Sequence, residues 1–173
     1  LHPEMVSIIE HTKESGIDVA LTTNGVLLRK EIVERVLINT EWIKVSINGG
    51  TRETYAKIHQ SKPDDFDKVM ENMSFAAEIK KGNNYKCVLG MQLVLLPENH
   101  HEVVSLAKLA KDIGMDYLII KPYSQHPQSK TNQYSTIKYS DLEYLSEELG
   151  KVNSDNFSVV FRSNAMKKWD NNH

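Results

Sequence analysis

The feature that most constrains this sequence is a repeated alternation between amphipathic segments of helical period and short apolar segments rich in β-branched residues. Turn residues such as Gly16, Asn24, Gly25 and Gly114 separate these segments, and no two apolar segments are joined by a hairpin signal. Parallel strands need a crossover connection, which is usually a helix. The alternation therefore predicts an α/β protein with a parallel sheet, either doubly wound or a barrel.

Strands are expected over residues 17–22, 42–47, 86–96, 116–121 and 157–162. Helices are expected between Pro3 and Gly16 and over residues 29–38, 51–59, 64–81, 100–113, 140–149 and 164–169. In the first helix, Met5, Ile8 and Ile9 are predicted to face the core. Capping boxes are predicted at two helix starts, formed by Asn99 with Glu102 and by Ser140 with Glu143.

Composition excludes several classes of protein. The chain has 173 residues, of which 40% are hydrophobic, so it is not intrinsically disordered. A net charge of −2 predicts no nucleic-acid partner, and the absence of a long apolar run predicts no membrane span. The single cysteine, Cys87, excludes an internal disulfide and is typical of a reducing, cytoplasmic compartment. We expect it to be a buried, inert thiol.

Ligands of parallel α/β proteins bind at the carboxyl ends of the strands, where several polar side chains occur here. Thr23 and Asn24 follow the first predicted strand and either bind a polar ligand or form the turn into the next helix. Ser46 and Asn48 lie on one face of the second strand, because side chains alternate along a strand. They contact a hydroxylated ligand, or Asn48 caps the chain locally.

Two further polar side chains lie on or at the end of predicted strands. Gln92 interrupts an apolar strand, so its amide needs a ligand, a neighbouring residue or water as partner. Lys121 ends the fourth strand and either meets an anion or is solvated. The seven histidines show no metal-binding spacing, and no phosphate-binding glycine loop is present, so no metal ligands are predicted.

In chain order, five segments resemble the core of radical S-adenosylmethionine (SAM) enzymes, which are built on an incomplete (β/α)6 barrel. The segments are LHPE (1–4), LTTNG (21–25), VSINGGTRETYAKIH (45–59), LVLLPENHHEV (93–103) and GMDYLIIKPYS (114–124). The resemblance implies a partial TIM-like barrel that lacks its first two strands. Residues 1–139 would then hold strands three to six, and residues 140–173 would lead toward a missing C-terminal domain. Residues 158–164 resemble the link to an auxiliary-cluster domain of the SPASM or twitch kind.

The resemblance also implies roles for individual residues. The expected cofactor contacts are Thr23, Asn24, Ser46, Asn48 and Tyr123, and the expected substrate contacts are Gln92, Lys121 and Arg162. Ser46 would contact the amino-acid or ribose part of SAM, and Tyr123 would touch the adenine through its backbone. Asn48 stands where the family often has Asp.

The family's C-x3-C-x2-C loop, which holds a 4Fe-4S cluster, has no counterpart in the sequence, and Cys87 cannot replace three thiolates. The resemblance implies a parent enzyme that cleaves SAM reductively and starts radical chemistry on an unknown small molecule or peptide. This chain alone is expected to be inactive, to bind neither cofactor fully, and to self-associate through its exposed edge strand. The alternatives are a non-catalytic α/β module that binds a partner or metabolite, and a different barrel enzyme.

Overall fold

A single parallel sheet forms the centre of the protein. The computed structural model describes the chain except residues 1, 127 and 173, so Leu1 of the LHPE segment lies outside the described residues. The strands are β1 (Ala20–Thr23), β2 (Trp42–Ser46), β3 (Val88–Leu95), β4 (Tyr117–Pro122) and β5 (Ser158–Phe161). They lie in the order β1-β2-β3-β4-β5, and every neighbouring pair is parallel. The predicted α/β fold with five parallel strands is confirmed.

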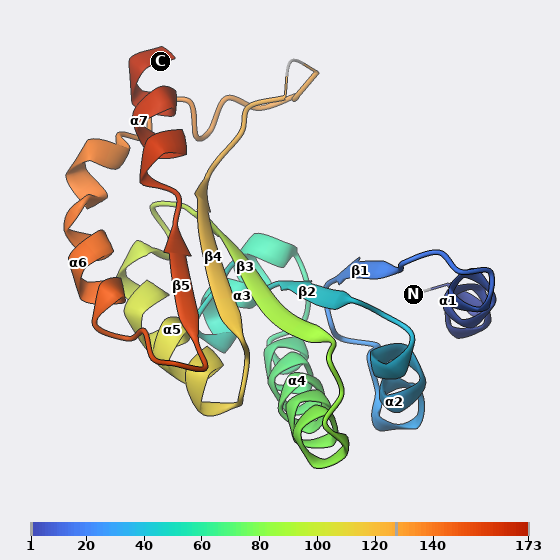
Figure 1. Cartoon of the computed structure of the whole chain (residues 1–173). Coiled ribbons are helices and arrows are strands. Elements are labelled where there is room, and N and C mark those ends of the chain that lie inside the picture. Colours follow the sequence, from blue (N-terminus) through green and yellow to red (C-terminus); the bar gives the residue numbers. More distant parts are fainter. Residues whose placement is uncertain (1, 127, 173) are drawn as a thin grey trace.

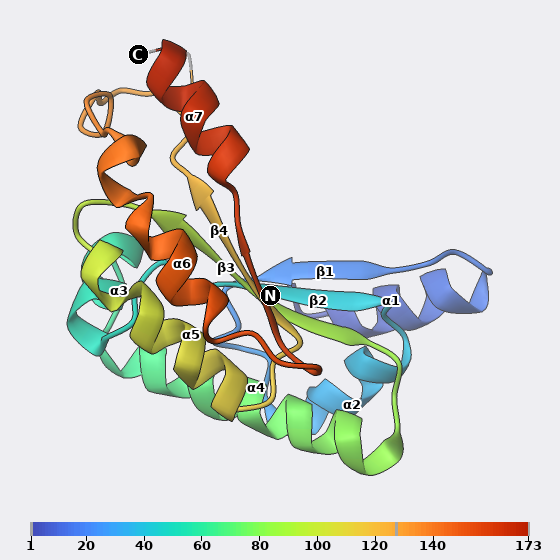
Figure 2. The same cartoon turned by 60° about the vertical axis from the view of Figure 1, so that its left-hand side comes forward.

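Helices cover one face of this sheet and leave the other face open (Figures 1 and 2). The helices are α1 (Met5–Glu14), α2 (Lys30–Ile38), α3 (Arg52–His59), α4 (Asp64–Asn83), α5 (Val103–Asp112), α6 (Tyr144–Gly150) and α7 (Ser163–Asn172). Two short 3-10 helices, η1 (His100–Glu102) and η2 (Tyr139–Leu142), precede α5 and α6. The α7 helix and the segment after β4 extend beyond the carboxyl ends of the strands (Figure 1).

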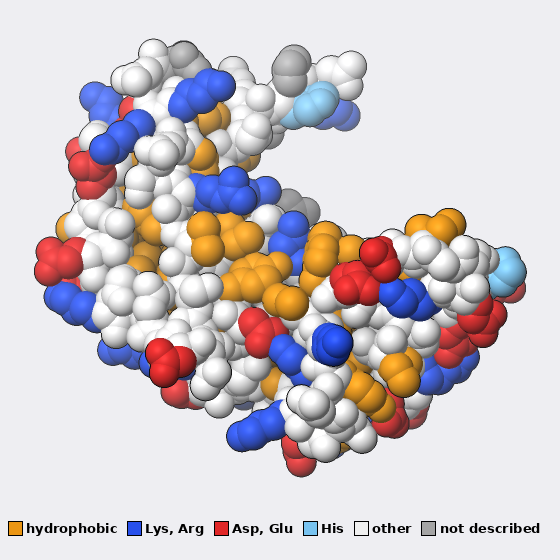
Figure 3. Space-filling view, viewed as in Figure 1, with side chains coloured by type: hydrophobic (Ala, Val, Ile, Leu, Met, Phe, Trp, Pro, Cys, Tyr) orange, Lys and Arg blue, Asp and Glu red, His pale blue; other side chains and the backbone are white. Residues whose placement is uncertain are grey.

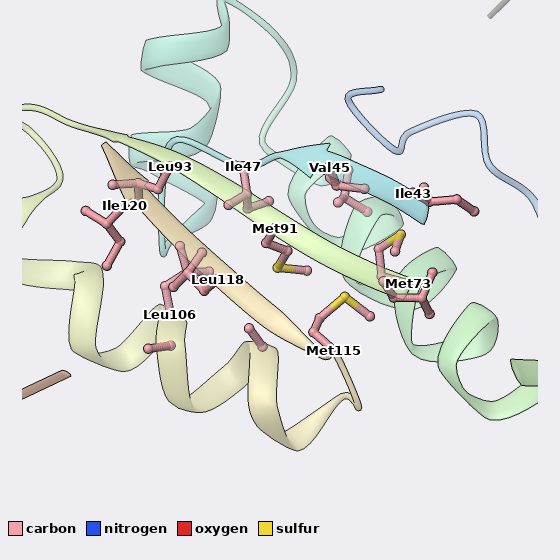
Figure 4. Packing of buried hydrophobic residues seen from close by; sticks show 14 of the residues in the cluster. Ile43, Val45, Ile47, Met73, Met91, Leu93, Leu106, Met115, Leu118 and Ile120 are labelled. Carbon is pink, nitrogen blue, oxygen red and sulfur yellow. The ribbon is translucent and has the colours of Figure 1, made fainter. Parts of the chain in front are cut away.

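The core lies between the sheet and the helices that cover it. Alternate residues of β2, β3 and β4 point toward the helices and are fully buried, as Val45, Met91 and Leu118 show. They meet Met73 of α4 and Leu106 of α5 (Figure 4). Full burial of a side chain of this size contributes roughly 1.5–3 kcal/mol. Because side chains alternate along a strand, the residues between these buried ones point to the open face.

The first helix and strand differ from the prediction. Ile8 is 53% exposed, whereas Val6 and Ile9 are the buried residues of α1, which packs against α2. Ile17 is 57% exposed, and β1 begins only at Ala20. Both differences have one cause: β1 is an edge strand with β2 as its one neighbour, so little of the sheet covers this region.

Neither predicted capping box forms. The Asn99 side chain is buried and accepts a hydrogen bond from the Leu96 N–H at 2.9 Å, while its amide donates to the Val94 carbonyl at 2.9 Å. Glu102 turns away from its own helix to the loop before α3. At the second site, the Asp170 carboxylate of α7 accepts hydrogen bonds from the N–H groups of Tyr139 and Ser140, at 2.9 and 2.7 Å. Distant partners replace the local ones in both cases.

The β5 strand pairs with β4, so residues 140–173 contribute to the same sheet as the preceding segment. The domain division at residue 139 stays a prediction. Among the described residues, no helix combines the length and the apolar character that a membrane crossing requires.

Candidate functional site

The open face carries a set of side chains arranged in rows across the strands. Residues in register on parallel strands point to the same face, and Ser46 of β2 is in register with Gln92 of β3. Gln92 is in register with Ile119 of β4, and Val94 with Lys121. Hydrophobic side chains gather at the centre of this hollowed face (Figure 3). Polar groups at the carboxyl ends of the strands thus border an apolar surface.

Ser46 and Gln92 are neighbours on this face. Side-chain alternation along the strand predicted that Ser46 points away from the face of Ile47. Both are partly buried, and neither side chain has a hydrogen-bond partner among the residues that the structure describes. A glutamine amide can donate two hydrogen bonds and accept two, so an unpaired one on a half-buried sheet favours a polar ligand or ordered water. Ile47, between Ser46 and Asn48, is fully buried on the helix side.

Asn48 joins the ends of β2 and β3. Its Oδ1 atom accepts a hydrogen bond from the Val94 N–H at 2.8 Å, and its backbone carbonyl accepts one from the Asn99 amide at 3.1 Å. The side-chain oxygen therefore continues the sheet, and the Nδ2 group is the part of Asn48 that is available to a ligand.

Thr23 and Asn24 make turn contacts. Thr23 is buried and in register with Val45, which belongs to the helix-covered face, and its Oγ1 accepts a hydrogen bond from the Gly25 N–H at 3.1 Å. Asn24 Oδ1 accepts one from the Val26 N–H at 3.3 Å. The structure does not bring Thr23 to the open face.

Thr22, the residue before Thr23, lies on the open face. It is in register with Lys44 of β2 and is exposed. Strand alternation counted from Thr22 would have predicted this side chain, because neighbouring strand residues point to opposite faces.

A pocket of about 450 Å³ lies where β4, β5 and α7 meet. It brings together Gln92, Lys121, Tyr123 and Arg162, which were all predicted as site residues. It also includes Lys168 and Trp169 of α7, which sequence reasoning missed. Their position in a helix after the last strand gave no sign that they return to the strand ends.

Tyr123 lines this pocket and also a second one of about 370 Å³, which Asn48, Val94 and Tyr134 line as well. The Tyr123 N–H already donates to the hydroxyl of Tyr139 at 2.7 Å. A backbone contact between Tyr123 and a bound adenine is therefore left to its carbonyl group.

The residues present do not fit a 4Fe-4S cluster. Cys87 is buried just before β3, where its sulfur lies 3.3 Å from the Thr40 hydroxyl, and burial raises the pKa of its thiol. No group of three His, Cys, Asp or Glu side chains in the described part of the chain is placed to hold a metal ion. Cluster ligands are thus not among the described residues.

Residues 1–110 match the family model of the Radical SAM superfamily, and the chain therefore belongs to this family, whose cofactors are SAM and a 4Fe-4S cluster. A probable GTP 3′,8-cyclase of Saccharolobus islandicus is 26% identical over 153 residues, covering 88% of this chain and 46% of that protein. The molybdenum cofactor biosynthesis protein moc-5 of Caenorhabditis elegans is 32% identical over 70% of this chain and 19% of its own length. The chain spans half the length of these relatives or less.

Solved structures share the fold. Streptococcus suis SuiB bound to S-adenosylmethionine superposes with a TM-score of 0.70 at 14% identity, over 93% of this chain and 36% of SuiB. A domain of a pyruvate-formate lyase-activating enzyme from Bacteroides vulgatus gives a TM-score of 0.63 at 16% identity, over 92% of this chain and 91% of that domain. The five-stranded sheet is thus consistent with a partial TIM-like barrel of this family.

Proposed function

We propose that this chain is part of the barrel of a radical SAM enzyme, and that its open face holds SAM and the substrate. The observation that supports this most directly is the adjacent pair Ser46, at the carboxyl end of β2, and Gln92, within β3, two polar side chains without partners in the described structure. When bound, SAM would supply radical chemistry: one electron from a reduced 4Fe-4S cluster held outside the described residues would split it into methionine and a 5′-deoxyadenosyl radical, which would remove a hydrogen atom from a substrate.

The residues of the chain bind and orient in this proposal. Ser46 hydrogen-bonds the amino-acid or ribose part of SAM, and the Nδ2 group of Asn48 contacts the ribose. Asn24 borders the cofactor, and Thr23 acts indirectly by stabilising the turn that holds Asn24. The apolar centre of the open face excludes water from the reacting groups.

Substrate contacts are assigned to Gln92, Lys121 and Arg162, which line one pocket. The relatives named GTP 3′,8-cyclase act on a nucleotide, and one SuiB structure holds the precursor peptide SuiA. We therefore propose that the substrate is a small molecule or a peptide. Because the described residues hold no cluster ligands, we expect the 173-residue chain by itself not to cleave SAM.

The experiment compares Ser46→Ala with Ser7→Ala, an exposed serine on α1, in the full-length protein that contains this chain. After cluster reconstitution, equilibrium dialysis measures SAM binding, and chromatography measures 5′-deoxyadenosine formed under dithionite. Loss of one hydrogen bond is expected to weaken SAM binding by about three- to tenfold in Ser46→Ala, and Ser7→Ala should match the unaltered protein. Absence of both SAM binding and 5′-deoxyadenosine in the unaltered protein would overturn the proposal and favour a non-catalytic module.

A further inference from the structure

We propose that the pocket between β4, β5 and α7 is an anion-binding subsite for a small molecule that carries a phosphate or carboxylate group beside a flat ring. The identification of this molecule as the substrate rests on the function proposed above. The pocket itself, with its charges and rings, is defined by the described residues alone.

Three cations converge on the pocket from three elements. Lys121 belongs to β4, and Arg162 directly follows β5 and is hydrogen-bonded through its N–H to the Ile120 carbonyl at 2.9 Å. This register places Arg162 beside Lys121. Lys168 reaches the pocket from α7, so the positive charges surround one hollow.

Among the described residues, no carboxylate is paired with these charges. The residues that line the pocket include no Asp or Glu, and none of the three cations forms an ion pair within the described part of the chain. The adjacent residue Lys167 differs, because it pairs with Glu143 at 3.4 Å. Like charges around one hollow repel one another until an anion enters, so the arrangement favours an anionic ligand.

Two aromatic rings line the pocket together with the apolar side chains of Ile119, Pro122 and Ala165. The ring centroids of Tyr123 and Trp169 lie 5.7 Å apart with an interplanar angle of 77°. The Trp169 indole donates a hydrogen bond to the Ile137 carbonyl at 3.1 Å, which holds its ring in place. The two rings thus pack edge to face against each other, and the ring surface that lines the pocket is an apolar wall for a flat ligand.

The size and polarity of the pocket further restrict the class of ligand. A volume of about 450 Å³ suits a small molecule. The amide of Gln92 at the floor of the pocket adds one directional donor and acceptor. Arginine binds phosphate and carboxylate groups in the same bidentate manner, so both anions are expected to bind.

Fluorescence of Trp169 provides the test. The chain has two tryptophans, so Trp42→Phe leaves Trp169 as the single tryptophan signal. The probes are phenyl phosphate, phenylacetate and benzyl alcohol, which share a ring and differ in charge. We expect saturable quenching by both anions, binding of benzyl alcohol at least about tenfold weaker, and loss of anion affinity between about 0.05 and about 0.5 M NaCl.

Matched variants locate the binding. Lys121→Met and Arg162→Gln should each weaken phenyl phosphate about tenfold, and Lys168→Met should do so to a smaller extent. The exposed residues Lys86 and Arg29 lie outside the pocket, so Lys86→Met and Arg29→Gln should leave affinity unchanged. Equal affinity for the three probes, or equal effects of pocket and control variants, would overturn the anion subsite.

SAM affinity, measured in the full-length protein carrying the same variants, separates this proposal from the previous one. Phenyl phosphate binding without SAM binding would leave the subsite intact and refute its assignment to a SAM enzyme. SAM binding without selective binding of the anionic probes would refute the subsite and leave the proposed function in place. Phenyl phosphate bound with phenylacetate excluded would restrict the ligand to phosphates.

Discussion

The carboxylate of Glu102 accepts a hydrogen bond from the backbone N–H of Gly50, with 2.8 Å between Oε2 and the nitrogen. Its other oxygen accepts hydrogen bonds from the hydroxyls of Thr51 and Thr54, at 2.8 and 2.7 Å. These contacts fasten the start of α5 to the loop that leads from β2 into α3. Since Ser46 ends β2 and Asn48 lies at the start of this loop, Glu102 holds both of these proposed cofactor contacts in position.

Glu102→Gln is expected to lower the free energy of unfolding by about 2 kcal/mol at neutral pH, because a charged acceptor of three hydrogen bonds is replaced by a neutral one. Burial raises the pKa of Glu102, but the hydrogen bonds from Thr54, Gly50 and Thr51 outweigh it and hold the pKa below 4.5. The stabilisation is therefore present above that value and is lost as the pH falls through the lowered pKa.

Urea unfolding at neutral pH and at decreasing pH measures this difference. The exposed Glu14 on α1 provides the control, and Glu14→Gln should behave as the unaltered chain does. A Glu102→Gln deficit that stays constant down to about pH 3 would contradict the role of the charge.

Gly90→Ala is expected to destabilise the sheet by about 1–3 kcal/mol. A Cβ atom at Gly90 would lie 2.0 Å from the ring of Tyr117, which covers this glycine from the neighbouring strand. Thermal unfolding measures the stability of Gly90→Ala, Tyr117→Ala and the double variant. The loss of stability in the double variant should be smaller than the sum of the losses in the two single variants.

The control for this series is Gly82→Ala in α4. Nothing lies within 4 Å of a Cβ atom there, and alanine is the better helix former, so stability should rise by about 0.5–1 kcal/mol. Additive effects in the Gly90 and Tyr117 double variant would show that the ring does not restrict residue 90.

Tyr139→Phe is expected to cost about 1–2 kcal/mol of stability, because the Tyr139 hydroxyl accepts from the Tyr123 N–H and donates to the Leu95 carbonyl at 2.9 Å. Burial raises the pKa of Tyr139 to about 12, although the hydrogen bond from Tyr123 lowers it. The contribution is fully present below the unfolded value of 10.0 and is lost as the pH rises toward about 12.

Guanidinium unfolding across this alkaline range tests the prediction. Tyr144 is mostly exposed on α6, so Tyr144→Phe serves as the control. If Tyr139→Phe and the unaltered chain lost stability in parallel above pH 10.0, the buried hydroxyl would not be the group responsible.

Self-association of the 173-residue chain is expected to increase with concentration. Trp42 of β2, next to the edge strand β1, is 37% exposed, and Val88, its neighbour on β3, is 39% exposed. Sedimentation velocity should show a shift toward monomer in Trp42→Lys, whereas Ile38→Lys, at an exposed site on α2, should not change the distribution. A monomer at every concentration would disprove this prediction.

The sequence by itself predicted the order and type of the elements, because each depends on local periodicity and turn chemistry. The helix that ends at Glu14, two residues before Gly16, and the strands around Val45 and Met91 follow from such patterns. Period-two alternation also placed Ser46 opposite to the buried Ile47. The Radical SAM family followed from the same segments, because its motifs occupy the strand ends.

Tertiary structure decided which partner each polar group takes. The spacing of Asn99 and Glu102 matched a capping box, yet Glu102 binds Gly50. Asp170, and not Glu143, accepts the hydrogen bond from the N–H of Ser140. Lys168 joins Lys121 and Arg162 only because α7 returns over the ends of β4 and β5. A local sequence pattern predicts only the hydrogen bonds that residues close in sequence can form with one another. A distant group that folding brings into better geometry competes for the same donors, and its position depends on the packing of the whole chain.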